Sequence, residues 1–210
     1  MSDSKIINPA YRIETERLVV RCYQPSDTQL LADSVIESVE HLKPWMEWAE
    51  RDPIDLDSVI ARLRRFRSRF DLGQDFAYTI LSSDESRILG GTGLHTRLGE
   101  GALEIGYWIH ADFINQGLAT EVSAALTRVA FEVQRVNRVE IHCDPANVRS
   151  AAVPRKLGYT HEATLAQRLL TTGGTWRDSM IWTLLAEDYP QSPCPDASIK
   201  AFDVIGRRIL

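Results

Sequence analysis

Three short segments between Phe76 and His110 constrain the fold more than any other part of the sequence. Each is rich in β-branched, aromatic and glycine residues: FAYTIL at 76–81, RILGGTGLH at 87–95 and ALEIGYWIH at 102–110. The polar stretches SSDES and TRLGEG between them are typical of tight turns. The pattern predicts an antiparallel meander of three strands, and therefore a domain built around a sheet.

Helical periodicity surrounds this meander. Apolar residues recur at helical spacing from Asp55 to Leu72 and again from Gly117 to Val133. The sequence PSD at 25–27 indicates a helix start, and a shorter helix is expected from Val148 to Leu157. Further strand-like segments lie at 18–23, 139–144, 161–170 and 176–184. The sequence therefore predicts an α/β (α+β) domain of about seven strands flanked by helices.

The charge balance narrows the range of partners. There are 24 Lys and Arg residues against 29 Asp and Glu, a net charge of −5, which does not favour nucleic acid or an anionic membrane. The arginines at 62–69 fit a solvated helix face better than an anion site. The sequence has no apolar run of about 20 residues and no secretory signal, and its three cysteines are widely separated. These features predict a cytoplasmic protein.

The junction after the third meander strand is the predicted ligand site. The segment ADFINQGLATE, from Ala111, places a glycine at a helix start, where the first N–H groups have no intrahelical partner. Such donors and the helix dipole suit a phosphate or pyrophosphate, although an ordinary capped helix is the alternative. The donors would come from Gln116, Gly117, Leu118, Ala119 and Thr120.

Other phosphate and metal motifs do not occur in the sequence. GGTG at 90–93 runs into a strand-like segment rather than a helix, and there is no GxxxxGK[ST], GxSxG or HExxH. His110 and Asp112 are the nearest approach to a metal pair. A site without a metal is therefore predicted.

Six segments together carry a resemblance to a known family. In order they are IETERLVVR, HLKPWMEW, LEIGYWIH, NQGLATE, NVRSAAVPRKLGY and WRDSMIWTLL, spanning about Ile13 to Tyr189. In these segments the sequence resembles the GNAT superfamily of acyl-CoA N-acyltransferases, in the branch of the ribosomal-protein N-terminal acetyltransferases. The resemblance implies a mixed central sheet that is splayed between its fourth and fifth strands, 102–110 and 139–144, with acetyl-CoA in the split. The sequence is expected to form one N-acetyltransferase domain over residues 1–190. The stretch YPQSPCP ends this compact part, and residues 191–210 form a C-terminal tail, for which a helix docked on the domain or on a partner is one form.

The resemblance also implies cofactor contacts. The turn at 116–120 would hold the pyrophosphate, and Asn147 would hydrogen-bond the pantetheine or an ordered water. Ser150 occupies the position proposed in this branch to protonate the leaving thiolate, and a plain helix cap is the alternative. Because such a cofactor is a polyanion, Arg149 or Arg155 is also expected to add positive charge. The fourth strand would pair with the pantetheine arm through backbone groups of Trp108, Ile109 and His110.

Two positions depart from the family pattern. Ile114 stands where the phosphate turn usually begins with Gln or Arg, which removes one side-chain contact. Pro154 stands where many members have a tyrosine acid, and we expect it in the first turn of a late-starting helix. These departures keep open an acyl-CoA-binding sensor with weak turnover.

The chemistry requires a base, because the acceptor amine arrives as an ammonium. Glu104 is the predicted base, with apolar neighbours expected to raise its pKa; a structural carboxylate is the alternative. A strand N–H near Ile109 or His110 would stabilise the oxyanion. Trp45 and Trp48 would either line the acceptor groove or pack in the core.

The predicted function is direct transfer of acetyl from acetyl-CoA to a primary amine. The acceptor is a protein N-terminus, as the branch implies, or a small molecule such as an antibiotic or a polyamine. The acidic surplus favours a cationic acceptor. An interaction module that uses the arginine-rich helix is a further alternative. The oligomeric state stays open, a homodimer included.

Overall fold

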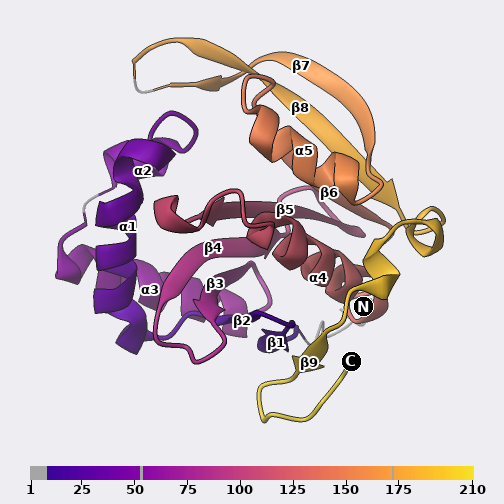
Figure 1. The fold of residues 1–210 in the computed structure, drawn as a ribbon, viewed down its shortest axis with the longest axis horizontal. Coiled ribbons are helices and arrows are strands. Elements are labelled where there is room, and N and C mark those ends of the chain that lie inside the picture. The colour runs from indigo at the N-terminus through magenta and orange to yellow at the C-terminus, as the bar shows by residue number, and fades with distance from the viewer. Residues whose placement is uncertain (1–8, 53, 172) are drawn as a thin grey trace, which may run out of the picture.

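The computed structural model describes residues 9–52, 54–171 and 173–210. They form one sheet of nine strands in the order β7-β8-β6-β5-β4-β3-β2-β1-β9 (Figure 1). The expected meander is β3, β4 and β5, and the other expected strands are β2, β6, β7 and β8. The strands are β1 (Arg12–Glu14), β2 (Leu18–Cys22), β3 (Phe76–Ser82), β4 (Ile88–His95), β5 (Ala102–Ile109), β6 (Arg138–Cys143), β7 (Thr160–Leu170), β8 (Trp176–Leu185) and β9 (Lys200–Phe202).

Helices cover both faces of the sheet. On β3, Ala77 and Leu81 pack against α1 and α3, whereas the alternating residues Tyr78 and Ile80 belong to the cluster around α4. The expected helices are confirmed, except that PSD at 25–27 forms a short 3-10 turn before α1. The helices are α1 (Thr28–Leu42), α2 (Glu47–Arg51), α3 (Leu56–Asp71), α4 (Leu118–Glu132) and α5 (Val148–Lys156).

The sheet is splayed between β5 and β6, as expected for strands 102–110 and 139–144. These strands are parallel and pair only over Ala102–Glu104 and Arg138–Glu140. Beyond Glu104, β5 continues along β4, while β6 stays paired with β8 as far as Cys143. The two halves of the sheet therefore separate at their carboxyl ends, with α4 and α5 beside the opening (Figure 1).

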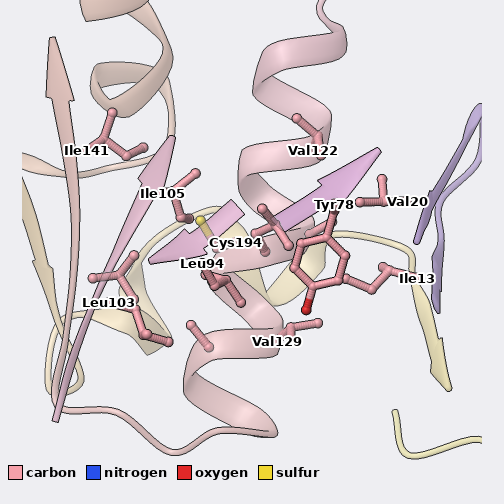
Figure 2. Close-up of a cluster of buried hydrophobic side chains, with 14 of the residues drawn as sticks. Ile13, Val20, Tyr78, Leu94, Leu103, Ile105, Val122, Val129, Ile141 and Cys194 are labelled. Atoms are coloured by element: carbon pink, nitrogen blue, oxygen red, sulfur yellow. The ribbon is translucent and has the colours of Figure 1, made fainter. Parts of the chain in front are cut away.

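The main core lies between the sheet and α4. Figure 2 shows Leu103 and Ile105 of β5 and Ile141 of β6 on the sheet side, with Val122 and Val129 reaching them from α4. Burying each such side chain contributes about 2 kcal/mol relative to leaving it in water. This packing fixes the axis of α4, and with it the position of its N-terminus beside the split.

The C-terminal segment adds a strand to the sheet. β9 pairs antiparallel with β1, with Ala201 opposite Ile13, and lies at the edge far from the split (Figure 1). The docked helix considered for this segment is therefore wrong, because Lys200–Phe202 instead satisfies the open backbone edge of β1. Within the described residues, no helix is long and apolar enough to cross a membrane.

Candidate active site

A cleft of about 460 Å³ opens where β5 and β6 separate. Its walls are the end of β5, the starts of α4 and α5, and the end of α1 with the segment that follows. Arg149 and Lys156 bring positive charge to it, whereas Arg155 lies over the ring of Trp182. The predicted residues that line the cleft are Trp45, Trp108, Ile109, Gly117, Leu118, Ala119, Thr120, Asn147 and Ser150.

The start of α4 presents free backbone donors to this cleft. Gly117 has φ +81°, a left-handed conformation that glycine adopts without a steric cost. Its carbonyl accepts the N–H of Glu121, so the helix bonds begin there, and the N–H groups of Leu118, Ala119 and Thr120 have no intrahelical acceptor. This arrangement can bind an anionic group.

An arginine from a distant part of the chain braces this turn. Arg17, between β1 and β2, donates from Nη1 to the carbonyl of Gln116 at 3.0 Å and from Nε to Glu121 Oε2 at 2.7 Å. The side chain of Gln116 itself donates to the carbonyl of Asp112, and Gln116 does not line the cleft. Sequence reasoning missed Arg17, because no local pattern links it to the turn.

The peptide groups of β5 alternate between β4 and the split. The N–H of His110 donates to Leu89 of β4, and its carbonyl accepts from Phe113, so His110 offers no backbone group to the split. Successive peptides in a strand point to opposite sides, so Trp108 also faces β4, while Ile109 and Tyr107 face the split. Of the three residues expected to pair with pantetheine, only Ile109 has its backbone in position.

The side chain of His110 is also engaged within the fold. Its Nδ1 accepts the N–H of Asp112 at 3.1 Å, so Nε2 carries the proton and donates to Glu37 at 2.9 Å. Glu37, His110 and Asp112 place candidate metal-ligand atoms within 4.8 Å of one another. Both ring nitrogens already have partners, so the group serves to join α1 to the end of β5.

The two tryptophans have different surroundings. Trp45 lines the cleft, in line with the acceptor-groove interpretation. Trp48 packs into the cluster between the sheet, α1 and α3, and its ring meets the ring of Trp108 edge-on at 5.9 Å. The core interpretation therefore holds for Trp48.

The start of α5 is organised by Asn147 and by a tyrosine of β5. Asn147 Oδ1 accepts the N–H of Ser150 at 3.1 Å, so Asn147, rather than Ser150, caps the helix. The hydroxyl of Tyr107 lies 3.1 Å from both the carbonyl and Oγ of Ser150. Pro154 lies inside the helix and not in its first turn, so that expectation is wrong. Because Pro154 has no N–H for the carbonyl of Ser150, the Tyr107 hydroxyl donates to it instead.

Glu104 is buried and does not line the cleft. Arg97 Nε donates to its Oε2 at 2.6 Å, and Arg97 Nη2 donates to Oε1. Burial alone would raise the pKa of Glu104, but the hydrogen bonds and charge of Arg97 outweigh burial and hold the pKa below its ordinary value. The expected increase in pKa is therefore wrong, because Arg97 folds back from the turn after β4.

This ion pair predicts a pH-dependent contribution to stability. A carboxylate with a lowered folded-state pKa stabilises the fold above its unfolded pKa, and the contribution is lost as pH falls through the folded pKa. We therefore expect Glu104→Gln to lower the free energy of unfolding at pH 7 and to matter less below about pH 4. Urea denaturation at pH 7 and pH 3 measures this difference.

The matched control is Glu47→Gln, which removes an exposed pair with Arg51 on α2. Such surface pairs contribute about 0.5 kcal/mol or less, so the free energy of unfolding of this variant should be close to that of the unmodified protein at both pH values. An equal loss for Glu104→Gln at pH 7 and pH 3 would contradict the account.

Glu140 and His142, which lie next to Glu104, were not predicted as site residues from the sequence. His142 Nε2 lies 2.6 Å from Glu140 Oε2, and its Nδ1 lies 3.7 Å from Glu104 Oε2. The two-residue alternation of VEIHCD places Glu140 and His142 on one face, which was a usable signal. Their meeting with Glu104 depends on the parallel register of β5 and β6.

Comparison with known proteins gives a match over most of the chain. Residues 17–160 match the model of the acetyltransferase (GNAT) domain. A ribosomal protein uS5-alanine N-acetyltransferase of Escherichia coli is 29% identical over 183 residues, which cover 86% of this chain and 94% of that protein.

Solved structures share the fold. A ribosomal-protein-S5-alanine acetyltransferase from Vibrio fischeri superimposes with a TM-score of 0.76 at 22% identity, covering 85% of this chain and 98% of that one. RimJ of Mycobacterium smegmatis, in complex with a CoA disulfide, gives a TM-score of 0.76 at 23% identity, covering 90% and 93%. At 22% and 23% identity, these two superpositions show a shared fold and nothing further.

Proposed function

The chain belongs to the GNAT acetyltransferase family and is an acetyl-CoA-dependent N-acetyltransferase, and we propose that its acceptor is the α-amine of a protein N-terminus. The observation that carries the proposal is the open split between β5 and β6, with the free donors of α4 beside it. The E. coli relative is named as a ribosomal protein uS5-alanine N-acetyltransferase, which favours a protein acceptor.

In the proposed complex the cofactor lies along the cleft. Its pyrophosphate accepts hydrogen bonds from the amides of Leu118, Ala119 and Thr120, and Arg149 and Lys156 add positive charge. The pantetheine arm runs beside β5, where the peptide of Ile109 faces the split. Arg17 stabilises the turn through its hydrogen bonds to the carbonyl of Gln116 and to Glu121.

The reaction needs positioning more than covalent help, because a thioester is already activated. The N–H of Ile109 is proposed to stabilise the oxyanion of the tetrahedral intermediate. Ser150 is proposed to protonate the thiolate, and its Oγ lies 3.1 Å from the hydroxyl of Tyr107. Glu104 is proposed to supply negative charge near the amine without contacting it, since Arg97 donates to both of its carboxylate oxygens.

The acceptor would enter beside Trp45, from the side of α1 and α2. A small-molecule amine is the alternative acceptor, because the net charge of −5 suits either kind of cation. A sensor that binds acyl-CoA without efficient turnover is a second alternative. These candidates differ in what the protein acetylates when it is given acetyl-CoA.

Mass spectrometry of acetylated products tests the proposal. The protein is incubated with acetyl-CoA and one of three acceptors: a peptide with a free N-terminal alanine, an N-terminally blocked peptide with one lysine, or spermidine. We expect acetylation of the alanine peptide and little of the others. Preference for spermidine would overturn the N-terminal proposal in favour of a small molecule. Thermal stabilisation by CoA without any turnover would overturn it in favour of the sensor.

A further inference from the structure

A histidine of β6 lies between two buried carboxylates at the base of the split. Each carboxylate is also paired with an arginine: Glu104 with Arg97, and Glu140 with Arg138, whose Nε lies 2.7 Å from Glu140 Oε1. The His142 side chain is 26% exposed, against 7% for Glu104 and 10% for Glu140. None of these three side chains lines the cleft, and among them the imidazole is the most exposed, so it is the one that a substrate can reach.

The hydrogen bonds leave one ring nitrogen of His142 available. The contact of 2.6 Å to Glu140 is a hydrogen bond in which Nε2–H donates to the carboxylate. In the neutral ring Nδ1 then carries the lone pair, and its distance of 3.7 Å from Glu104 Oε2 is too long for a hydrogen bond. Among the described residues, no hydrogen bond to Nδ1 is formed, so it can accept one from an ammonium.

Carboxylates flank both nitrogens of this ring. Glu140 Oε2 faces Nε2, and Glu104 Oε2 faces Nδ1. Arg97 and Arg138 pair with those carboxylates from the other side.

Other charged groups near the cluster have partners of their own. His95, opposite Glu104 on β4, is 2.9 Å from Asp75. Asp144, further along the chain from His142, pairs with Arg177 of β8. From β7, Glu162 accepts the hydroxyl of Thr183, the residue of β8 opposite Glu140. Of the two histidines near Glu104, His142 lies on β6, at the point where β5 and β6 separate, whereas His95 lies on β4, on the other side of β5 from the split.

The position of His142 suits an acceptor that enters from the α2 side. The register pairs Glu104 with Glu140, and residues two apart in a strand share a face, so His142 lies on the face of Glu104. Trp108, four residues beyond Glu104, lies on the same face and contacts Trp48 of α2. The opposite face carries α4 and α5, where the cofactor is proposed to lie. The acceptor and the cofactor would thus meet across the split.

We propose that His142 is the catalytic residue that takes a proton from the acceptor ammonium, an inference that rests on the function proposed above. Nδ1 accepts one proton, and the freed amine lone pair attacks the thioester carbon. The C–N bond forms and the C–S bond breaks. Ser150 gives its hydroxyl proton to the CoA sulfur and takes the second amine proton in its place, and the imidazolium releases its proton to water. Glu104 and Glu140 act as positioning residues that orient the ring and stabilise its charge.

The test is the pH profile of acetyl transfer to the alanine peptide for the unmodified protein, His142→Gln and Glu140→Gln. We expect His142→Gln to lower kcat by about 100-fold or more, with unchanged CoA affinity and loss of the acid limb of the profile. Glu140→Gln, which keeps the ring, should move that limb to lower pH. Added imidazole should restore part of the activity of His142→Ala.

The control is His161→Gln, which changes an exposed histidine of β7 that is hydrogen-bonded to Thr164. It should leave kcat and the pH profile unchanged. If His142→Gln keeps most of its activity and the same profile, the inference is overturned. If His142→Gln fails to fold, Glu140→Gln decides, because an unmoved acid limb also overturns the inference. Failure of the unmodified protein to acetylate the peptide would instead overturn the proposed function.

Discussion

Gly117→Val is expected to lower the affinity of the cleft for CoA by about 100-fold, or about 2.7 kcal/mol. Gly117 has φ +81°, and a β-branched residue there is strained by about 2 kcal/mol. A Cβ at this position would meet only Arg17, with Nη2 at 3.7 Å, so the cost is conformational and not a clash. The chain relieves it by turning the peptide, which redirects the amides of Leu118 and Ala119.

Isothermal titration with CoA measures this effect. Gly206→Val is the matched control, because Gly206 has φ +80°, would have no atom within 4 Å of an added Cβ, and lies in the C-terminal turn. Both variants should lose similar stability, and only Gly117→Val should lose CoA affinity. Equal CoA affinity in the two variants would show that the start of α4 does not hold the phosphates.

Gly90→Ala is expected to destabilise the fold by about 3 kcal/mol. A Cβ on Gly90 would lie 2.2 Å from the carbonyl oxygen of Trp108 on the neighbouring strand. Backbone atoms cannot move aside as the end of a side chain can, so β4 and β5 must separate locally. Strand β5, which borders the cleft, is then displaced where its hydrogen bonds to β4 are disrupted.

Urea denaturation measures the loss of stability. Gly173→Ala is the control, because its nearest neighbour to an added Cβ is Thr171 Oγ1 at 3.8 Å, an ordinary contact. We expect that control to change the free energy of unfolding by about 0.5 kcal/mol or less. A similarly small effect of Gly90→Ala would mean that β4 and β5 are packed less tightly than described.

The local periodicity of apolar residues was sufficient to predict many of the helices and strands. The spacing of apolar residues predicted α3 and α4, and short β-rich segments between turns predicted the meander of β3, β4 and β5. It could not predict β1 and β9. Each has three residues, and it is their pairing across most of the chain that makes them strands.

In the site, even more than in the fold, the outcome depends on contacts between segments that are distant in the sequence. Its place on the fourth predicted strand put Glu104 near the split, but the pKa of Glu104 depends on Arg97, whose side chain returns from the adjoining turn. The backbone N–H of His110 is taken by the carbonyl of Leu89 on the neighbouring strand. Pro154 fits inside α5 because the hydroxyl of Tyr107 donates to the carbonyl that a proline leaves without a donor. Each of these outcomes is a non-local contact, which no single segment of sequence contains.

Hydrogen–deuterium exchange with and without CoA tests the central claim most directly, since it reports which amides the cofactor protects. We expect protection of the start of α4, at Leu118 to Thr120, and of Ile109 on β5, with little change in strands β1 and β9 far from the split. Protection elsewhere, with exchange at 118–120 unaltered by saturating CoA, would contradict the placement of the cofactor in the split between β5 and β6.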